Sequence, residues 1–443
     1  MEAADGHDGA GAVSRPSPGK GGVFLHTRLV EVGGGVRVRR LGGTRAGEMR
    51  ITRFLRNRAV SVEEIVASAH ARTAGRVVGR HVLAIQDTTD VRVASDNSGI
   101  VLHPTVAVDA ADGTLLGLVE AELLGRTGAQ RGRRKQRAFA DKQSRRWLRG
   151  AERAADLHAA GAAAITVIAD REGDIYEDFA LRPPGVELVI RAGQDRRLRD
   201  GTRLFAHTAG VPEAGRMTVD LPAAPGRPAR TAVLALRFRP VEIARPVSRK
   251  RGAELAALPA SVTLTLVEAC EIDPPPGGVP VAPWRLLTTH AVGDLAAARR
   301  IVGYYRQRWT IEQVFRTLKT KGFDVEALRI AEGPFEKLVT AALVAAISVL
   351  QLVRERDGTA GRPLTDALDA DDRPILEAVS TSLEGQTARQ KNPHPKDSLA
   401  FAAWVFARLG GWTGYYGKPG PVVILNGLIR FHAIKRGWTL HDV

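Results

Sequence analysis

Two short apolar runs, each followed directly by an aspartate, place the strongest constraint on what this chain can fold into. The first run, His81–Gln86, is followed by Asp87, and the second, Ala162–Ala169, is followed by Asp170. Runs of this length and composition predict buried strands. A helix-start pattern comes after Asp170, and in open α/β sheets ligands bind at the carboxyl ends of strands. We therefore expect a site at the strand ends, although an aspartate in this position is common and weakly specific by itself.

A later segment, Tyr305–Lys319, contains no Gly or Pro and predicts an amphipathic helix. At ~100° per residue, one wedge of roughly 60° carries a hydroxyl, a guanidinium, a carboxylate and an amine, from Tyr305, Arg308, Glu312 and Lys319. Another face carries Ile311, Val314 and Leu318, with Phe315 at the border. The alternative is a solvated face with an Arg308–Glu312 pair, which contributes only ~0.2–0.5 kcal/mol.

The three acidic residues Asp87, Asp170 and Glu312 suit metal-dependent phosphoryl transfer. Mg²⁺ prefers hard oxygen ligands, and two such ions ~3.5–4 Å apart can clamp the attacking and leaving oxygens of an in-line displacement. Carboxylates from separate elements are needed to hold both ions. We therefore predict two Mg²⁺ ions at this site, with Mn²⁺ as a substitute, and Arg308 and Lys319 as phosphate contacts.

The chain is strongly basic, with 64 Lys and Arg against 48 Asp and Glu and a net charge of +16. Such a charge favours a nucleic-acid partner, although a general bias toward Arg would also produce it. The densest basic stretch lies between residues 126 and 149 and includes Arg131, Arg133, Arg134, Lys135 and Arg137. A phosphate-contacting loop and a solvated charged loop both remain open for it.

Composition divides the chain into four regions. We expect an irregular or altered N-terminal segment (1–45), an N-terminal helical region (46–80), a catalytic domain (81–357) and a C-terminal helical domain (358–443). Within the catalytic domain, residues 186–292 contain several strand-like segments separated by Pro/Gly stretches, which predicts a β-rich insertion before the Glu312 helix.

Other classes of protein fit less well. The single cysteine, Cys270, allows neither a disulfide within the chain nor a cysteine-based zinc site. Serine-hydrolase, Walker-loop and His-Glu-x-x-His motifs are missing. The apolar run Leu338–Val353 is too short to span a bilayer and predicts a buried helix. We expect a cytoplasmic protein without a membrane partner, associated with the nucleoid if the source is bacterial.

Several motifs in order resemble the bacterial cut-and-paste DDE transposases of the IS-four group, of the transposon-five type. Tyr305-x2-Arg308-x3-Glu312-x6-Lys319 resembles their Y-R-E-K signature. Further matching stretches are Asp87-Thr-Thr, Asp170-Arg-Glu-Gly-Asp174, Trp284-x-Leu-Leu-Thr, Pro395-Lys-Asp-Ser-Leu399 and Leu409-Gly-Gly-Trp412. The resemblance covers residues 48–440.

The resemblance implies an RNase H-like catalytic core with a β-rich insertion, flanked by helical regions. It implies that Asp87, Asp170 and Glu312 bind two divalent ions, which cleave transposon ends and join them to target DNA. Tyr305, Arg308 and Lys319 would contact phosphates. Trp284 would stack on a flipped base with help from Trp309, the alternative being core packing for both tryptophans. Double-stranded DNA with inverted repeats and a homodimer that pairs two ends would be the partners.

The N-terminal segment departs from this family pattern, because family members carry a longer helical domain there for reading the inverted repeat. Residues 1–45 are rich in Gly and predict no convincing helix. Two alternatives to a transposase therefore stay open: a truncated or relict DNA-binding regulator that inhibits transposition, and a nuclease of the same fold that hydrolyses DNA without joining it.

Overall fold

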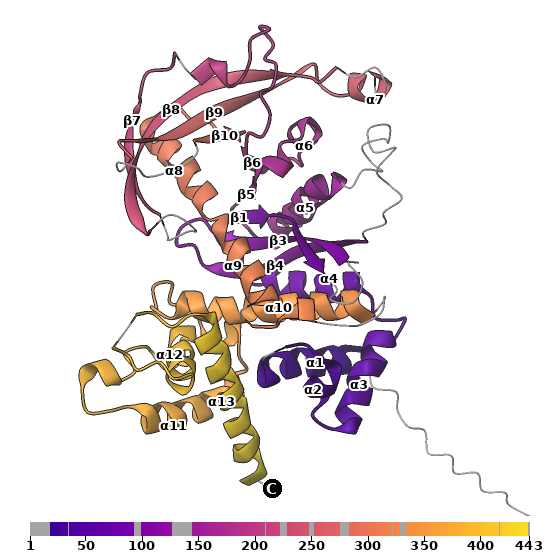
Figure 1. The fold of residues 1–443 in the computed structure, drawn as a ribbon, viewed down its shortest axis with the longest axis vertical. Helices are drawn as coiled ribbons and strands as arrows, with labels where there is room; N and C mark the ends of the chain where they lie inside the picture. Colours follow the sequence, from indigo (N-terminus) through magenta and orange to yellow (C-terminus); the bar gives the residue numbers. More distant parts are fainter. Residues whose placement is uncertain are drawn as a thin grey trace, which may run out of the picture.

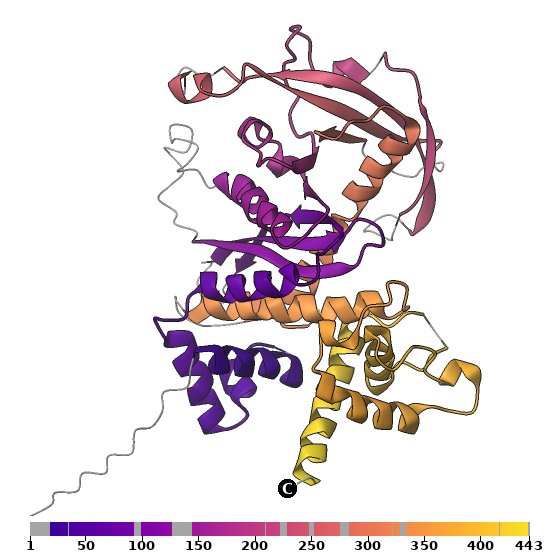
Figure 2. The ribbon, with the colours of Figure 1, turned by 180° about the vertical axis from the view of Figure 1, so that it is seen from behind.

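The structure is a computed structural model that describes residues 18–33, 35–92, 99–125, 144–208, 210–221, 228–247, 252–274, 283–320, 322–327, 334–415 and 417–441. A large mixed sheet forms one half of the molecule, and the N- and C-terminal helices form the other half (Figure 1). The long helix α10 (Pro334–Glu355) runs between the two halves. The N-terminal helices before residue 57 and the helices after residue 372 lie on its side away from the sheet, whereas the helix Val62–Ala74 lies on the sheet side (Figure 2).

The described helices and strands follow each other along the chain as a mixed α/β fold. The helices are α1 (Pro18–Val32), α2 (Val38–Gly42), α3 (Arg45–Arg56), α4 (Val62–Ala74), α5 (Arg145–Ala155), α6 (Tyr176–Ala180), α7 (Gly252–Ala256), α8 (Leu295–Arg306), α9 (Trp309–Lys319), α10 (Pro334–Glu355), α11 (Arg373–Leu383), α12 (Leu399–Leu409) and α13 (Pro421–His441). The strands are β1 (His81–Gln86), β2 (Thr89–Arg92), β3 (Gly99–Asp109), β4 (Leu115–Gly125), β5 (Ala164–Ala169), β6 (Val186–Arg191), β7 (Gly215–Leu221), β8 (Arg230–Ala244), β9 (Ser261–Ile272) and β10 (Trp284–Thr288).

The sheet has a parallel centre with antiparallel strands on both sides. Strand β5 lies between β1 and β6 and is parallel to both. On one side β3 pairs antiparallel with β1 and with β4. On the other side the order continues as β6-β10-β9-β8-β7. Strands joined in parallel need a crossover connection, and this mixed arrangement is consistent with the expected RNase H-like core.

The expected strands are present, with one change in how they group. The two apolar runs before Asp87 and Asp170 form β1 and β5, and the Asp112-Gly113 hairpin joins β3 to β4, with Gly113 at φ +76°. The β-rich block was expected to begin at residue 186. Its first strand, β6, instead belongs to the parallel centre because it pairs with β5. Strands β7–β10 extend the same sheet rather than forming a separate one.

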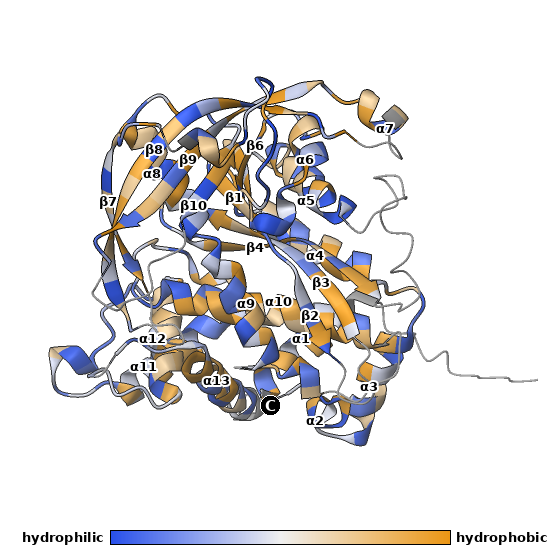
Figure 3. Cartoon of the chain, turned by 45° about the horizontal axis from the view of Figure 1, so that its top comes forward, coloured by the Kyte–Doolittle hydropathy of each residue, from blue (hydrophilic) through white to orange (hydrophobic). Residues whose placement is uncertain are grey.

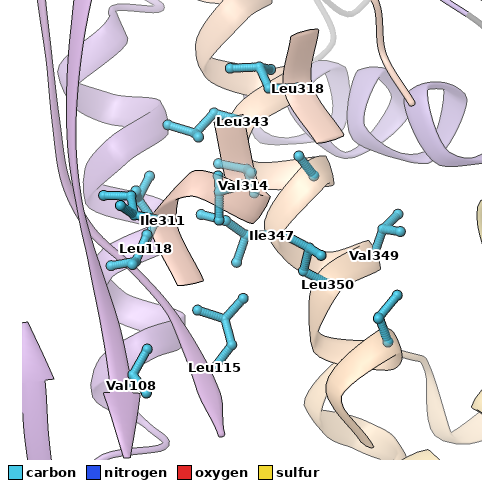
Figure 4. Close-up of a cluster of buried hydrophobic side chains, with 14 of the residues drawn as sticks. Val108, Leu115, Leu118, Ile311, Val314, Leu318, Leu343, Ile347, Val349 and Leu350 are labelled. Carbon is cyan, nitrogen blue, oxygen red and sulfur yellow. The ribbon is translucent and has the colours of Figure 1, made fainter. Parts of the chain in front are cut away.

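The apolar face of α9 packs where the sequence pattern predicts. Ile311, Val314 and Leu318 are fully buried, and Phe315 lies partly buried at the edge of the same cluster. Figure 4 shows Ile311 and Val314 between Leu118 on the sheet side and Ile347 of α10. Burial of a side chain of this size stabilises the fold by about 1.5–3 kcal/mol. This packing therefore fixes which face of α9 is left for the polar residues.

The N-terminal segment differs from the expectation of irregular structure. Residues 18–32 and 38–42 are helical, while residues 1–17 lie outside the described part of the chain. A glycine inside a helix costs about 0.5–1 kcal/mol, but Leu25 and Leu29 are fully buried and offset this cost. Glycine is also needed where α2 meets α3, since a Cβ on Gly47 would lie 2.1 Å from the Gly42 carbonyl oxygen.

Ser61 and Glu64 form a capping box that begins α4. Hydrophilic and hydrophobic residues alternate along α3, whose outer face is basic (Figure 3). Before α11 the chain forms two short 3-10 helices, Leu364–Asp366 and Ala370–Asp372, and Asp369 and Asp372 cap each other in the second.

Helix α10 contains the apolar run that was expected to be a buried helix. Its segment Phe335–Glu355 is long and apolar enough to cross a membrane by length and composition alone. However, 83% of its most apolar window is buried inside the molecule. The apolar character of α10 is therefore accounted for by its position between the sheet and the terminal helices.

We predict that Leu318→Ala lowers the free energy of unfolding by about 2–5 kcal/mol, because the fully buried side chain leaves a cavity between α9 and α10. Urea unfolding measures this change. Arg316→Ala, an exposed position on the same helix, is the control and should stay within about 0.5 kcal/mol of the unmodified chain. Equal losses for both variants would contradict the packing of α9.

Candidate active site

The parallel pairing of β1 and β5 brings two aspartates to one edge of the sheet. In the register of this pair, Ile85 lies beside Ile168, and both strands end within one residue of that position. Asp87 follows β1 directly, and Asp170 follows β5 directly. The strand ends thus place two carboxylates side by side, as the sequence predicts.

The helix that carries Glu312 is not continuous over the whole expected segment. Helix α8 ends at Arg306 and α9 begins at Trp309. At the junction, the amide of Arg308 donates to the carbonyl of Tyr305 over 3.0 Å, three residues back instead of four. Arg308 keeps helical backbone angles of φ −52° and ψ −31°. The chain is tightened here rather than broken, so the polar residues stay on one side.

Arg308 lies between two of the three carboxylates. Its Nη1 donates to Asp87 Oδ2 over 2.8 Å, and its Nη2 donates to Glu312 Oε1 over 2.5 Å. The Arg308 residue is 8% exposed, while its Nε is buried without a hydrogen-bond partner. The Glu312 side chain is 43% exposed. The cluster is therefore covered around the guanidinium and open to solvent beside Glu312.

The third carboxylate is held by Tyr305, whose hydroxyl donates to Asp170 Oδ1 over 3.1 Å. Tyr305 is only 2% exposed, and its ring packs edge-on against Trp284 at 5.8 Å. Trp284 itself is 6% exposed and belongs to the main hydrophobic core. In this structure, Trp284 thus has the core position that the sequence left open as the alternative to base stacking. Trp309 is half-buried at the start of α9.

Burial and neighbouring charges shift the pKa of three of these groups. Burial raises the pKa of Asp87 to about 6, with Asp170 and Glu312 adding to the rise and the Thr88 amide and Arg308 opposing it. Burial, with Asp170 nearby, raises the pKa of Tyr305 to about 12. Burial alone would lower the pKa of Arg308, but Tyr305, Asp170, Glu312 and Asp87 outweigh it and raise that pKa. At neutral pH, Arg308 therefore stays charged and Tyr305 stays a neutral hydrogen-bond donor.

The donor chemistry of the cluster fits divalent cations, since three oxygen-bearing side chains gather with an excess of negative charge. Their arrangement fits less closely, because Arg308 separates Asp87 from Glu312. Across the part of the chain that the structure describes, no three Asp, Glu, His or Cys side chains are close enough to share an ion. Asp87, Asp170 and Glu312 would hold ions only if the guanidinium moved from between them.

The other sequence-predicted DNA contacts lie apart from this cluster or outside the described residues. Lys319 lies at the end of α9, where its Nζ bonds to the Asp90 carbonyl and lies 3.5 Å from Glu326 Oε1. The basic stretch with Arg131, Arg133, Arg134, Lys135 and Arg137 is outside the described residues. A cavity of about 850 Å³ lies between the N- and C-terminal helices, and none of the three carboxylates lines it.

Two further cations lie beside the cluster: Arg191, which was not singled out from the sequence, and Arg146, which belongs to the basic stretch between residues 126 and 149. Arg191 is the last residue of β6, next to the end of β5, and its charge opposes part of the rise in the pKa of Tyr305. Arg146 of α5 donates to Thr88 Oγ1 over 3.3 Å and to Glu172 Oε2 over 3.3 Å. Arg191 ends a third parallel strand at the same edge as the two aspartates. Its place at the end of a predicted strand was the sequence signal from which Arg191 could have been identified.

Asp174 stabilises a loop and does not belong to the carboxylate cluster. Its carboxylate accepts from the amides of Gly193 and Gln194 and from Arg196 Nε, and the Asp174 side chain is fully buried. This buried ion pair with Arg196 ties the loop after β6 to the loop after β5.

A comparison with protein families matches residues 93–347 to the transposase DDE domain. The match covers more than half of the 443 residues. It includes Asp170, Tyr305, Arg308 and Glu312, and it begins just after Asp87.

We predict that Tyr305→Phe lowers the free energy of unfolding by about 1.5–3 kcal/mol, because Asp170 loses a hydrogen bond to a charged acceptor. Urea unfolding checks this value. The matched control is Tyr304→Phe, whose hydroxyl makes only a 3.4 Å contact with His81 Nδ1. The control should lose at most about 0.5 kcal/mol. The reverse order of the two losses would argue against the Tyr305–Asp170 bond.

Proposed function

The chain belongs to the DDE transposase family, and we propose that it cleaves and joins transposon DNA by a cut-and-paste mechanism that depends on Mg²⁺ or Mn²⁺. The observation that carries the proposal is the placement of Asp87 and Glu312 at Arg308, and of Asp170 at the neighbouring Tyr305, in a chain whose residues 93–347 match a transposase domain. The Tyr305, Arg308, Glu312 and Lys319 spacing supports a finer assignment to the IS-four group.

Each side chain of the cluster has a distinct task under this proposal. Asp87, Asp170 and Glu312 would hold the divalent ions, which when bound supply the charge that activates water and stabilises the leaving oxygen. Tyr305 holds Asp170 in place through its hydroxyl and remains neutral because its pKa is about 12. Arg308 supplies a guanidinium suited to a phosphate of the cleaved strand. Arg146 and Arg191 are further phosphate contacts beside the strand ends.

The basic face of α2 and α3 is the surface that we propose for binding DNA ends. It consists of the exposed Arg37, Arg39, Arg40, Arg45, Arg50, Arg53, Arg56 and Arg58. Such a cluster supplies sequence-independent affinity for the phosphate backbone. The basic stretch with Arg131–Arg137 is proposed as a second backbone contact, and base stacking by Trp284 would require this ring to leave the core.

The remaining parts of the proposal follow from the family. We propose a homodimer that pairs two transposon ends through the C-terminal helices, acting in the cytoplasm on nucleoid DNA. The alternative of a relict DNA-binding regulator was based on an irregular N-terminal segment. Because this segment contains the helices α1 and α2, the argument for that alternative is weaker. A nuclease of the same fold shares the carboxylate cluster, and only the products of the reaction separate it from a transposase.

We predict that Asp87→Asn, Asp170→Asn and Glu312→Gln each reduce nicking of DNA by more than about 100-fold, since even outer-shell changes at metal sites cost 10–100-fold. The substrate is a supercoiled plasmid that carries the gene with its flanking DNA, incubated with Mn²⁺ or Mg²⁺. Glu377→Gln on α11 is the control carboxylate and should keep full activity. Full activity in all three cluster variants would refute the site.

The same reaction separates joining from hydrolysis. A transposase produces strand-transfer products in which flanking DNA ends are joined to a second plasmid. A nuclease of this fold produces nicked and linear DNA without joined products.

We predict that Arg53→Ala combined with Arg56→Ala weakens DNA binding and reduces the slope of log affinity against log salt by about 2, because each phosphate contact contributes about 0.9. Fluorescence anisotropy with a short duplex at several salt concentrations measures the slope. The control pair, Arg373→Ala with Lys396→Ala, removes two cations that already pair with Glu377 on α11. An unchanged slope in the α3 variant would exclude this face as the DNA contact.

A further inference from the structure

We propose that Arg308 acts as an internal cation that keeps Asp87 and Glu312 in a metal-free arrangement and leaves them when a DNA phosphate binds. Metal binding and DNA binding are then coupled through one guanidinium. The inference rests on the proposed function and adds the regulation of its site. Its consequence is a site that takes up metal weakly without DNA and tightly with DNA.

The hydrogen bonds of Arg308 carry the first step. Its two terminal nitrogens are each used by a carboxylate that the proposed function assigns to metal, at 2.8 Å to Asp87 and 2.5 Å to Glu312. Its Nε is buried without a hydrogen-bond partner. The guanidinium therefore interacts mainly with the groups that a metal would need, and it occupies the space between them.

Because both are positively charged, the Arg308 guanidinium and a divalent ion cannot both lie between Asp87 and Glu312. A single guanidinium among three carboxylates leaves an excess of negative charge, which attracts a divalent ion. An ion bound by Asp87 and Glu312 would repel the guanidinium at the short distances of this cluster. Metal uptake thus requires Arg308 to move away.

A phosphate supplies the place to which Arg308 can move. Guanidinium groups bind phosphate oxygens with two parallel hydrogen bonds, as they bind carboxylates. The cluster is open beside Glu312, whose side chain is 43% exposed, so a DNA backbone can approach from that side. The backbone of Arg308 is fixed in the tightened turn between α8 and α9, so only its side chain needs to turn. Once the phosphate holds the guanidinium, both carboxylates are available for metal.

Thermodynamic linkage makes the coupling reciprocal, because DNA must raise the affinity for metal by the same factor by which metal raises the affinity for DNA. Couplings of this kind typically reach about 5–150-fold. Removing the guanidinium should give the same gain without DNA. The variant Arg308→Gln should therefore bind metal tightly whether or not DNA is present.

The test measures free Mn²⁺ by electron paramagnetic resonance, at a pH well above the Asp87 pKa of about 6. The full chain is titrated alone and with a short duplex, and Mn²⁺ bound by the duplex alone is subtracted. For the unmodified protein we expect the Mn²⁺ affinity to rise about 5–150-fold with DNA. For Arg308→Gln we expect the higher affinity throughout. Arg306→Gln, an exposed neighbour at the end of α8, is the matched control and should behave as the unmodified chain.

Two outcomes separate the inference from the function on which it rests. If Glu312→Gln binds Mn²⁺ as the unmodified chain does, the carboxylate cluster is not the metal site. The proposed metal-dependent function is then overturned together with the coupling. If Mn²⁺ binding needs Glu312, but neither DNA nor Arg308→Gln changes the affinity, the coupling is overturned and the function stands. Circular dichroism checks folding, and should Arg308→Gln fail to fold, Arg308→Lys takes its place. A lysine keeps the charge but cannot bridge both carboxylates, so an intermediate affinity without DNA is expected and an unchanged one overturns the coupling.

Discussion

The bridge from Arg308 to Asp87 and Glu312 is the interaction on which the arrangement of the site depends. It joins the end of β1 to α9 across 221 residues of sequence, through two charged hydrogen bonds. The bond from Tyr305 to Asp170 adds the end of β5 to the same assembly. A buried carboxylate needs a partner, and removal of one member of such a pair typically costs about 3–5 kcal/mol. The strands and helices thus depend on each other through this small group of charges.

Apolar packing decides where that bridge can form. Leu318 and its neighbours on α9 are held between the sheet and α10 (Figure 4). With that face fixed, the polar face of α9 can only turn toward the strand ends. The tightened turn before α9 then sets the direction of Arg308. The apolar face of α9 therefore fixes where the helix lies, and the charged groups determine which residues its polar face contacts.

The sequence predicted the parts that depend on local pattern. The strands before Asp87 and Asp170 and the buried face of α9 follow from hydrophobic runs and periodicity, and the structure has them. Periodicity gives the face of a helix but not its partner, so it could not show Arg308 bound to Asp87. It also could not place Trp284 in the core beside Tyr305, which depends on strand pairing. The glycine-rich helices α1 and α2 were missed because their stability comes from tertiary burial rather than from local propensity.

Burial also decides between the two explanations of the polar face of α9. A solvated Arg308–Glu312 pair would leave the guanidinium in water and contribute little to stability. Here Glu312 is partly exposed, whereas Arg308 is covered and its Nε has no hydrogen-bond partner. A buried polar atom without a partner lowers stability, so an ordinary surface pair would not adopt this position. Positions that break a local rule at a cost to stability are typical of functional sites. The unpartnered Nε of Arg308 therefore distinguishes this position from an ordinary solvated pair on a helix surface.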